Sequence, residues 1–181
     1  ILALRGDPPG NVRGEWVAHP EGLDHAEDLV RLVRGLGDFT VGVAAFPEGH
    51  PESPDLQQDA RVLALKQQAG AEFAITQLFF TADDYFALVA RIRALGCNIP
   101  IIPGIMPITN VRQVTRFAEL SGAALPLSVT DRMNEVADDD DLDARKPLFQ
   151  DRADAAQEFR DFRDRDRDVV GDASSCLRVC I

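Results

Sequence analysis

The fold of this chain is decided by the stretch FAITQLFF, residues Phe73 to Phe80, and the stretch IPIIPGIMPITN, residues Ile99 to Asn110. Both are apolar runs with few polar interruptions. A strand that is apolar on both faces is typical of a parallel sheet covered by helices. Gln77 interrupts the first run, and a buried amide without a partner would cost about 1–3 kcal/mol. We therefore expect Gln77 to have a partner, and a ligand is one candidate.

Strand-like runs alternate with helical patterns over the first two thirds of the chain. The runs ILALRGD and FTVGVAAF, which begin at Ile1 and Phe39, precede helical patterns over residues 25–36 and 55–68. The two deciding stretches precede further helical patterns, over residues 81–95 and 110–120. This alternation predicts βαβ units in one parallel sheet with right-handed crossovers.

Residue spacing predicts where these helices begin, end and pack. Thr81 with Asp84 resembles a capping box, and Gly96 is a typical helix stop. Apolar residues three or four apart predict the buried side of each helix. For the first and third helices these residues are Leu29, Leu32, Val33, Leu36, Leu88, Val89, Ile92 and Leu95.

Composition restricts the class of protein. The chain has 181 residues, of which 45% are hydrophobic, and this suits one domain with a real core. A formal net charge of −11 argues against a nucleic-acid surface. No apolar run reaches the ~18 residues of a membrane span, and three cysteines do not make a disulfide framework. No secretory leader follows Ile1, so we expect a cytoplasmic protein.

The composition changes near residue 137, so we divide the chain into a domain over residues 1–136 and a charged tail over residues 137–181. The tail contains DDDD from Asp138 and RDFRDRDRD from Arg160. We interpret it as disordered or as the product of a reading-frame error. A solvated helix stabilised by opposite charges is the alternative.

Ligands of parallel α/β proteins bind at the carboxyl ends of the strands. No Ser-His-Asp set, metal-ligand spacing or glycine-rich nucleotide loop is found in the sequence. Hydrogen-bonding groups without an evident nucleophile suit an enzyme whose cofactor carries the reaction. The residues that the sequence places at the strand ends are Arg5, Gly6, Asp7, Phe46, Glu48, His50, Thr76, Gln77 and Gly104 to Asn110.

Four motifs in order, LRGDPPG, AAFPEGHPES, AGAEFAITQLFF and PIIPGIMPITNVRQVTRFAEL, closely resemble the catalytic domain of methylenetetrahydrofolate reductases. The resemblance covers about residues 1–126. It implies an α/β fold that is part of a (β/α)8 TIM barrel, from about the fourth strand through the seventh helix. It also implies FAD as cofactor, NADH or NADPH as co-substrate and 5,10-methylenetetrahydrofolate as the substrate that is reduced to 5-methyltetrahydrofolate. The intact enzyme is expected to be a homo-oligomer, without a nucleic-acid or membrane partner.

The resemblance also assigns roles to individual residues. It implies catalytic roles for Asp7 and Gln77, and the same two residues would bind the folate together with Gln113 and Phe117. Asp59 and Lys66 lie seven residues apart on one helix face, and without the resemblance we would interpret them as exposed helix charges. The residues that the resemblance assigns to FAD are Arg5, Gly6, Asp7, Trp16, Phe46, His50, Asp59 and Lys66.

The resemblance places a general-acid glutamate upstream of Ile1, and an arginine near a segment that residues 137–181 do not resemble. We therefore expect this chain alone to be inactive and prone to aggregation, because an incomplete barrel leaves sheet edges unpaired. The alternatives are a non-functional truncated or frame-disrupted copy, another (β/α)8 enzyme, and a binding module that uses the acidic tail. An aldolase-type barrel would need a lysine at a strand end, whereas Lys66 lies on a predicted helix and Lys146 in the tail.

Overall fold

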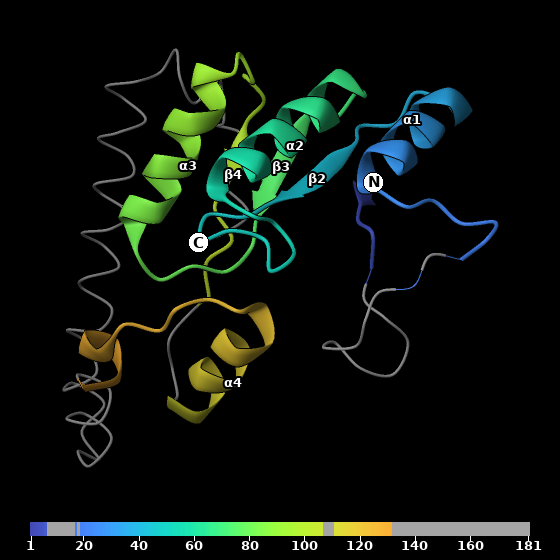
Figure 1. Ribbon diagram of the computed structural model, residues 1–181. Helices are drawn as coiled ribbons and strands as arrows, with labels where there is room; N and C mark the ends of the chain where they lie inside the picture. The colour runs from blue at the N-terminus through green and yellow to red at the C-terminus, as the bar shows by residue number, and fades with distance from the viewer. Residues whose placement is uncertain (7–16, 18, 107–110, 132–181) are drawn as a thin grey trace.

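The described residues form a four-stranded parallel sheet, in which a helix connects each strand to the next along the chain (Figure 1). A computed structural model describes residues 1–6, 17, 19–106 and 111–131. Asp7, Trp16 and the tail over residues 137–181 lie outside the described residues. The elements are β1 (Leu2–Ala3), α1 (Ala26–Leu36), β2 (Gly42–Ala45), α2 (Leu56–Gln68), β3 (Phe73–Thr76), α3 (Ala82–Ala94), β4 (Ile101–Ile102) and α4 (Val111–Ser121).

The strands lie in sequence order, β1-β2-β3-β4, and every neighbouring pair is parallel. Val43 pairs with Ala3 on one side and with Ala74 on the other, and Ala74 pairs with Ile101. The predicted parallel α/β sheet is therefore confirmed. The described residues form an open sheet, and its closure into a barrel remains a prediction.

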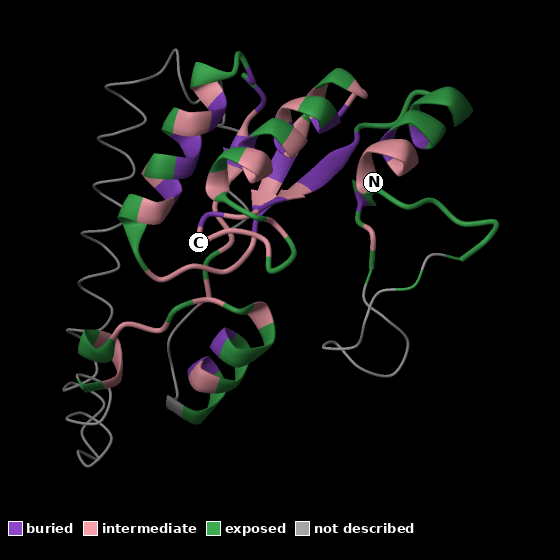
Figure 2. Ribbon diagram, viewed as in Figure 1, coloured by how far each residue is buried: buried purple, intermediate pink, exposed green. Residues whose placement is uncertain are grey.

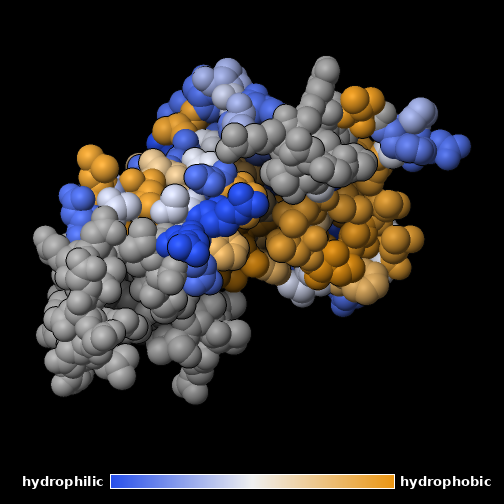
Figure 3. Space-filling model, turned by 90° about the horizontal axis from the view of Figure 1, so that it is seen from below, coloured by the Kyte–Doolittle hydropathy of each residue, from blue (hydrophilic) through white to orange (hydrophobic). Residues whose placement is uncertain are grey.

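The core lies between the sheet and helices α1, α2 and α3 (Figure 2). Every second residue of a strand, such as Val43 and Ala74, faces the helices and is fully buried. The residues between them face the other side of the sheet, where Leu2 and Leu4 are about half exposed, at 45% and 47%. One face of the sheet is thus packed and the other is open. A view from below shows hydrophobic residues gathered over part of the surface (Figure 3).

Side chains from α3 secure the edge strand β4. The Tyr85 hydroxyl donates to the Ile101 carbonyl over 2.9 Å, and its burial raises the tyrosine pKa. The Arg93 guanidinium donates to the carbonyls of Cys97 (2.6 Å) and Ile99 (3.1 Å). Cys97 is buried, as a small packing residue would be. These bonds give partners to one carbonyl of β4 and to two carbonyls of the segment that leads into it.

Several predicted details are wrong. The strands are shorter than the apolar runs, and because β3 ends at Thr76, Gln77 lies at the strand end, where the strand-end prediction put it. Leu32 and Leu36 are 50% and 72% exposed, because α1 turns Val33, as predicted, and Val30 inward. Leu95 is also exposed, at 44%.

The ends of α3 show how far local motifs hold. Thr81 is the N-cap as predicted, but its side chain makes no capping bond, so the capping box is not formed. Only its carbonyl accepts from the Asp84 amide, over 3.2 Å. Gly96 follows the helix with a positive φ of 74°, which fits the predicted glycine stop.

Candidate functional site

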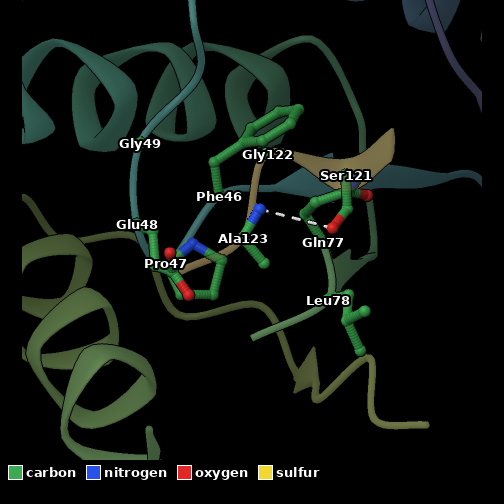
Figure 4. Close-up of a pocket in the computed structure, with 9 residues that line it drawn as sticks. All are labelled: Phe46, Pro47, Glu48, Gly49, Gln77, Leu78, Ser121, Gly122 and Ala123. Atoms are coloured by element: carbon green, nitrogen blue, oxygen red, sulfur yellow. Dashed lines mark hydrogen bonds between the residues drawn. The ribbon is translucent and has the colours of Figure 1, made fainter. Parts of the chain in front are cut away.

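The candidate site lies where the carboxyl ends of β2 and β3 meet. Phe46 follows β2 directly, and Gln77 follows β3 directly. The backbone N–H of Gln77 donates to the Ala45 carbonyl over 2.7 Å. Both residues line a small pocket, whose other wall is the turn after α4 (Figure 4). The pocket residues are Phe46, Pro47, Glu48, Gly49, Gln77, Leu78, Ser121, Gly122 and Ala123.

A carboxylate connects the two walls of this pocket. Glu48 Oε2 accepts from the Ala124 amide over 2.6 Å, although the residues are 76 positions apart in the chain. The Ala123 amide donates to Ser121 Oγ over 3.3 Å, the bond drawn in Figure 4. Glu48 therefore holds the segment after α4 against the loop after β2. The sequence placed Glu48 at a strand end but gave no signal for its partner.

Two contacts hold His50 in place, one to its backbone amide and one to its ring. The His50 amide donates to Asp59 Oδ2 over 3.0 Å, so the first turn of α2 anchors this loop. The His50 and Phe46 rings meet edge to face, with centroids 4.8 Å apart. Gly49 has a positive φ of 101°, a conformation that a side chain would disfavour. Phe46, His50 and Asp59 are therefore brought together as one cluster.

Arg5 reaches this cluster from β1. Its guanidinium donates to both carboxylate oxygens of Glu52, each over 2.8 Å. The Arg5 hydrogen bond and charge hold the pKa of Glu52 below its ordinary value. Gly6 has a positive φ of 81° and open space where a side chain would lie. The ends of β1, β2 and β3 thus contribute to one edge of the sheet.

Lys66 corrects the sequence interpretation of an exposed helix charge. Its side chain is only 8% exposed, and Nζ donates to the Ala44 carbonyl of β2 over 3.1 Å. Burial lowers the Lys66 pKa, and the charges of Asp59 and Glu27 oppose that shift. Asp59 is half-buried, so neither residue is a freely solvated charge. In this arrangement the ammonium group is hydrogen-bonded to the backbone of β2 and is not placed to bind a phosphate at the surface.

Helix α4 carries the remaining predicted residues away from the pocket. Gln113 and Phe117 share a helix face as expected, but they are exposed, with Phe117 at 44%. The adjoining face, with Val114 and Ala118, is buried. Among the described residues, the pocket thus unites Phe46 and Gln77 but not Gln113 or Phe117.

The strand ends bring an aromatic ring together with polar groups, a surface that a planar heterocyclic ring could contact. Phe46 supplies an apolar ring surface, while His50 and Gln77 supply polar groups beside it. Lys66 does not fit a phosphate in its present position, because its ammonium group is buried against Ala44. The described residues contain no group of three or more metal-ligating side chains and no helix able to cross a bilayer.

Comparison with known proteins identifies the family. The model of the methylenetetrahydrofolate reductase family matches residues 1–147. This chain belongs to that family. The match extends beyond residue 126, where the motifs recognised in the sequence end.

Curated relatives agree with this assignment. Methylenetetrahydrofolate reductase 2 of Saccharomyces cerevisiae is 40% identical over 146 residues, which are 78% of this chain and 24% of the relative. The 5,10-methylenetetrahydrofolate reductase of Escherichia coli is 39% identical over 147 residues, which are 81% of this chain and 46% of the relative. The chain therefore spans about a quarter of the length of the yeast relative and just under half of the length of the bacterial one.

Proposed function

We propose that this chain supplies the carboxyl-end wall of a site that reduces 5,10-methylenetetrahydrofolate to 5-methyltetrahydrofolate at the expense of NADH or NADPH. The observation that carries the proposal is the position of Phe46, His50 and Gln77 at adjoining strand ends, in a chain of this family. Carboxyl ends of parallel strands are where such folds bind ligands. We also propose that the intact enzyme is a homo-oligomer located in the cytoplasm, as the family resemblance implies.

FAD is the proposed cofactor, and when bound it would carry the hydride between the nicotinamide and the methylene carbon. Phe46 and His50 would hold it at the end of β2, together with Arg5, Gly6, Trp16 and Asp59. Lys66 could contact a phosphate only after leaving the Ala44 carbonyl, to which it now donates.

Gln77 is proposed to orient the pterin of the folate. A side-chain amide carries both a donor and an acceptor, so it can match the alternating donors and acceptors of a pterin edge. Asp7 is proposed as its catalytic partner beside the flavin. Gln113 and Phe117 are proposed to contact the folate from α4, which requires that helix to present its exposed face to the ligand.

The test measures binding rather than turnover, because the chain alone is proposed to be inactive. The purified full chain is titrated with FAD, and the change in flavin fluorescence is recorded. We expect saturable binding, and we expect 5-methyltetrahydrofolate to perturb the absorbance of the bound flavin. Absence of flavin binding up to about 1 mM, which corresponds to only about −4 kcal/mol, would contradict the proposal.

The variant Gln77→Ala separates this function from that of another flavin-binding barrel. It should retain FAD binding and lose the spectral response to the folate, because it removes only the pterin-orienting amide. Gln57→Ala is the matched control, since Gln57 is an exposed glutamine on α2. Equal folate responses in the two variants would show that Gln77 does not contact the folate.

A further inference from the structure

The hydrogen bonds around His50 determine which of its ring nitrogens carries a proton. Residues 50–53 form a β-turn in which the Ser53 amide donates to the His50 carbonyl over 2.9 Å. Within this turn the Glu52 amide donates to His50 Nδ1 over 3.1 Å. A backbone amide can only donate, so Nδ1 must be the acceptor. A neutral imidazole in this turn therefore carries its proton on Nε2.

The same turn is fixed to its surroundings at three points. Arg5 holds the Glu52 carboxylate with two hydrogen bonds of 2.8 Å from the end of β1. Asp59 holds the His50 amide from α2, and the Phe46 ring meets the imidazole from the end of β2. A bidentate arginine–carboxylate pair restricts orientation as well as distance. Glu52 thus connects the loop that carries His50 to a neighbouring strand.

We propose that Glu52 is a positioning residue that, through Arg5, holds His50 at the strand ends as an Nε2–H donor. The histidine then offers a hydrogen to the ligand and no acceptor, so it selects a ligand atom that accepts. In the flavin that acceptor is either an atom of the ring and ribityl portion or a phosphate oxygen. This inference rests on the proposed function for the identity of the ligand. The tautomer and the position of the ring do not depend on it.

The first experiment needs no ligand. The chain has only three histidines, so two-dimensional ¹H–¹⁵N correlation spectra can resolve their ring nitrogens. The signals that disappear in the variant His50→Gln are those of His50. The spectra are recorded about two pH units above the ordinary imidazole pKa of about 6.5. We expect the Nε2–H pattern for His50. An Nδ1–H pattern would overturn the assignment.

The role of Glu52 is tested by comparing two ion pairs. Glu52→Gln weakens the pair with Arg5, and Glu72→Gln weakens the pair between Glu72 and Arg34. Both pairs join distant segments, and the two glutamates are similarly exposed, at 55% and 48%. We expect Glu52→Gln alone to change the His50 ring-proton shifts that arise from the Phe46 ring. Equal spectra in the two variants would show that Glu52 does not position His50.

Flavin binding then tests the choice of ligand atom. We expect Glu52→Gln to weaken flavin binding about fivefold, the effect of one ordinary hydrogen bond, and Glu72→Gln to leave it unchanged. Riboflavin, FMN and FAD distinguish the two positions of the acceptor. A loss with all three assigns the contact to the ring or ribityl portion, and a loss confined to FMN and FAD assigns it to phosphate.

Failure of the two proposals can be told apart. Absence of flavin binding by the unaltered chain would contradict the proposed function, while the nuclear magnetic resonance spectra would still decide the tautomer and the role of Glu52. Flavin binding that is equal in Glu52→Gln and Glu72→Gln would leave the proposed function intact and would overturn the role of Glu52.

Discussion

The chain contains the sequence His-Pro-Glu twice, at residues 19–21 and 50–52, and both copies fold into the same turn. In each, the glutamate amide donates to His Nδ1 over 3.1 Å. In each, the fourth residue donates to the histidine carbonyl, over 2.8 Å for Gly22 and 2.9 Å for Ser53. Proline at the second position favours this turn by fixing φ. The local sequence therefore determines the turn and the ring nitrogen that accepts.

The two turns differ in what surrounds them. His19 and Glu21 are exposed, whereas His50 is half-buried and contacts Phe46. Glu52 pairs with Arg5, and Asp59 accepts from the His50 amide. The second turn also follows the end of a parallel strand, where ligands of such folds bind. A short motif thus supplies the geometry of the donor, and its position in the fold supplies the candidate role.

The largest difference between the turns should come from their anchors. We expect Asp59→Ala to lower the free energy of unfolding by about 1–3 kcal/mol, because it leaves the His50 amide without an acceptor. Asp24→Ala, an exposed change just after the first turn, should have little effect. Urea denaturation measures both. Equal shifts in the two variants would show that the second turn is no better anchored than the first.

Lys66, beside the Asp59 anchor, should make the stability around the second turn depend on pH. Its pKa is lower in the folded protein than the ordinary 10.5. Between these two values the unfolded chain binds more protons, so stability should rise with pH. The penalty is fully present below the folded pKa and is relieved as the pH approaches 10.5.

The variant Lys66→Met isolates this effect. The stability of the unaltered chain relative to Lys66→Met should increase with pH in that window, by about 1.4 kcal/mol for each unit of pKa shift. Tyr85 acts in the opposite direction at high pH because burial raises its pKa, but it is present in both proteins and its effect cancels. A difference that stays constant with pH would contradict the buried position of Lys66.

The smallest effect should be the same in both turns. Pro20→Ala and Pro51→Ala each make the unfolded chain more flexible, and each should cost about 0.4–1 kcal/mol. Because the turn is local in origin, we expect the two losses to agree. Thermal denaturation of the two variants provides the measurement. A much larger loss for Pro51→Ala would mean that the surroundings, and not the local sequence, hold the second turn in shape.

The sequence was sufficient for features that depend on neighbouring residues. The apolar runs predicted the parallel strands, and glycine predicted the end of α3 at Gly96. The rule that ligands bind at the carboxyl ends of parallel strands predicted that Phe46 and Gln77 lie at one site, and both residues line the same pocket. The two His-Pro-Glu turns also carried a local signal, proline after histidine, from which the tautomer of His50 could have been predicted.

Features that depend on distant residues were not predictable. Nothing in the sequence near Lys66 indicates that its ammonium group reaches the Ala44 carbonyl, 22 residues away. The same holds for Glu48 and the Ala124 amide. Leu32 and Leu36 have the spacing of a buried stripe, yet α1 packs through Val30 and Val33 and leaves these two leucines exposed.

The contact between β3 and β4 at their carboxyl ends has a consequence for tolerated variation. The Gly104 amide donates to Thr76 Oγ1 over 2.8 Å, and a Cβ at position 104 would lie 2.2 Å from the Thr76 carbonyl oxygen. Even alanine at that position would push the two segments apart. The displacement would fall on Thr76 and on Gln77, which is bonded to it, so a single methyl group on the far segment is expected to weaken the proposed contact of Gln77 with the pterin without touching the ligand.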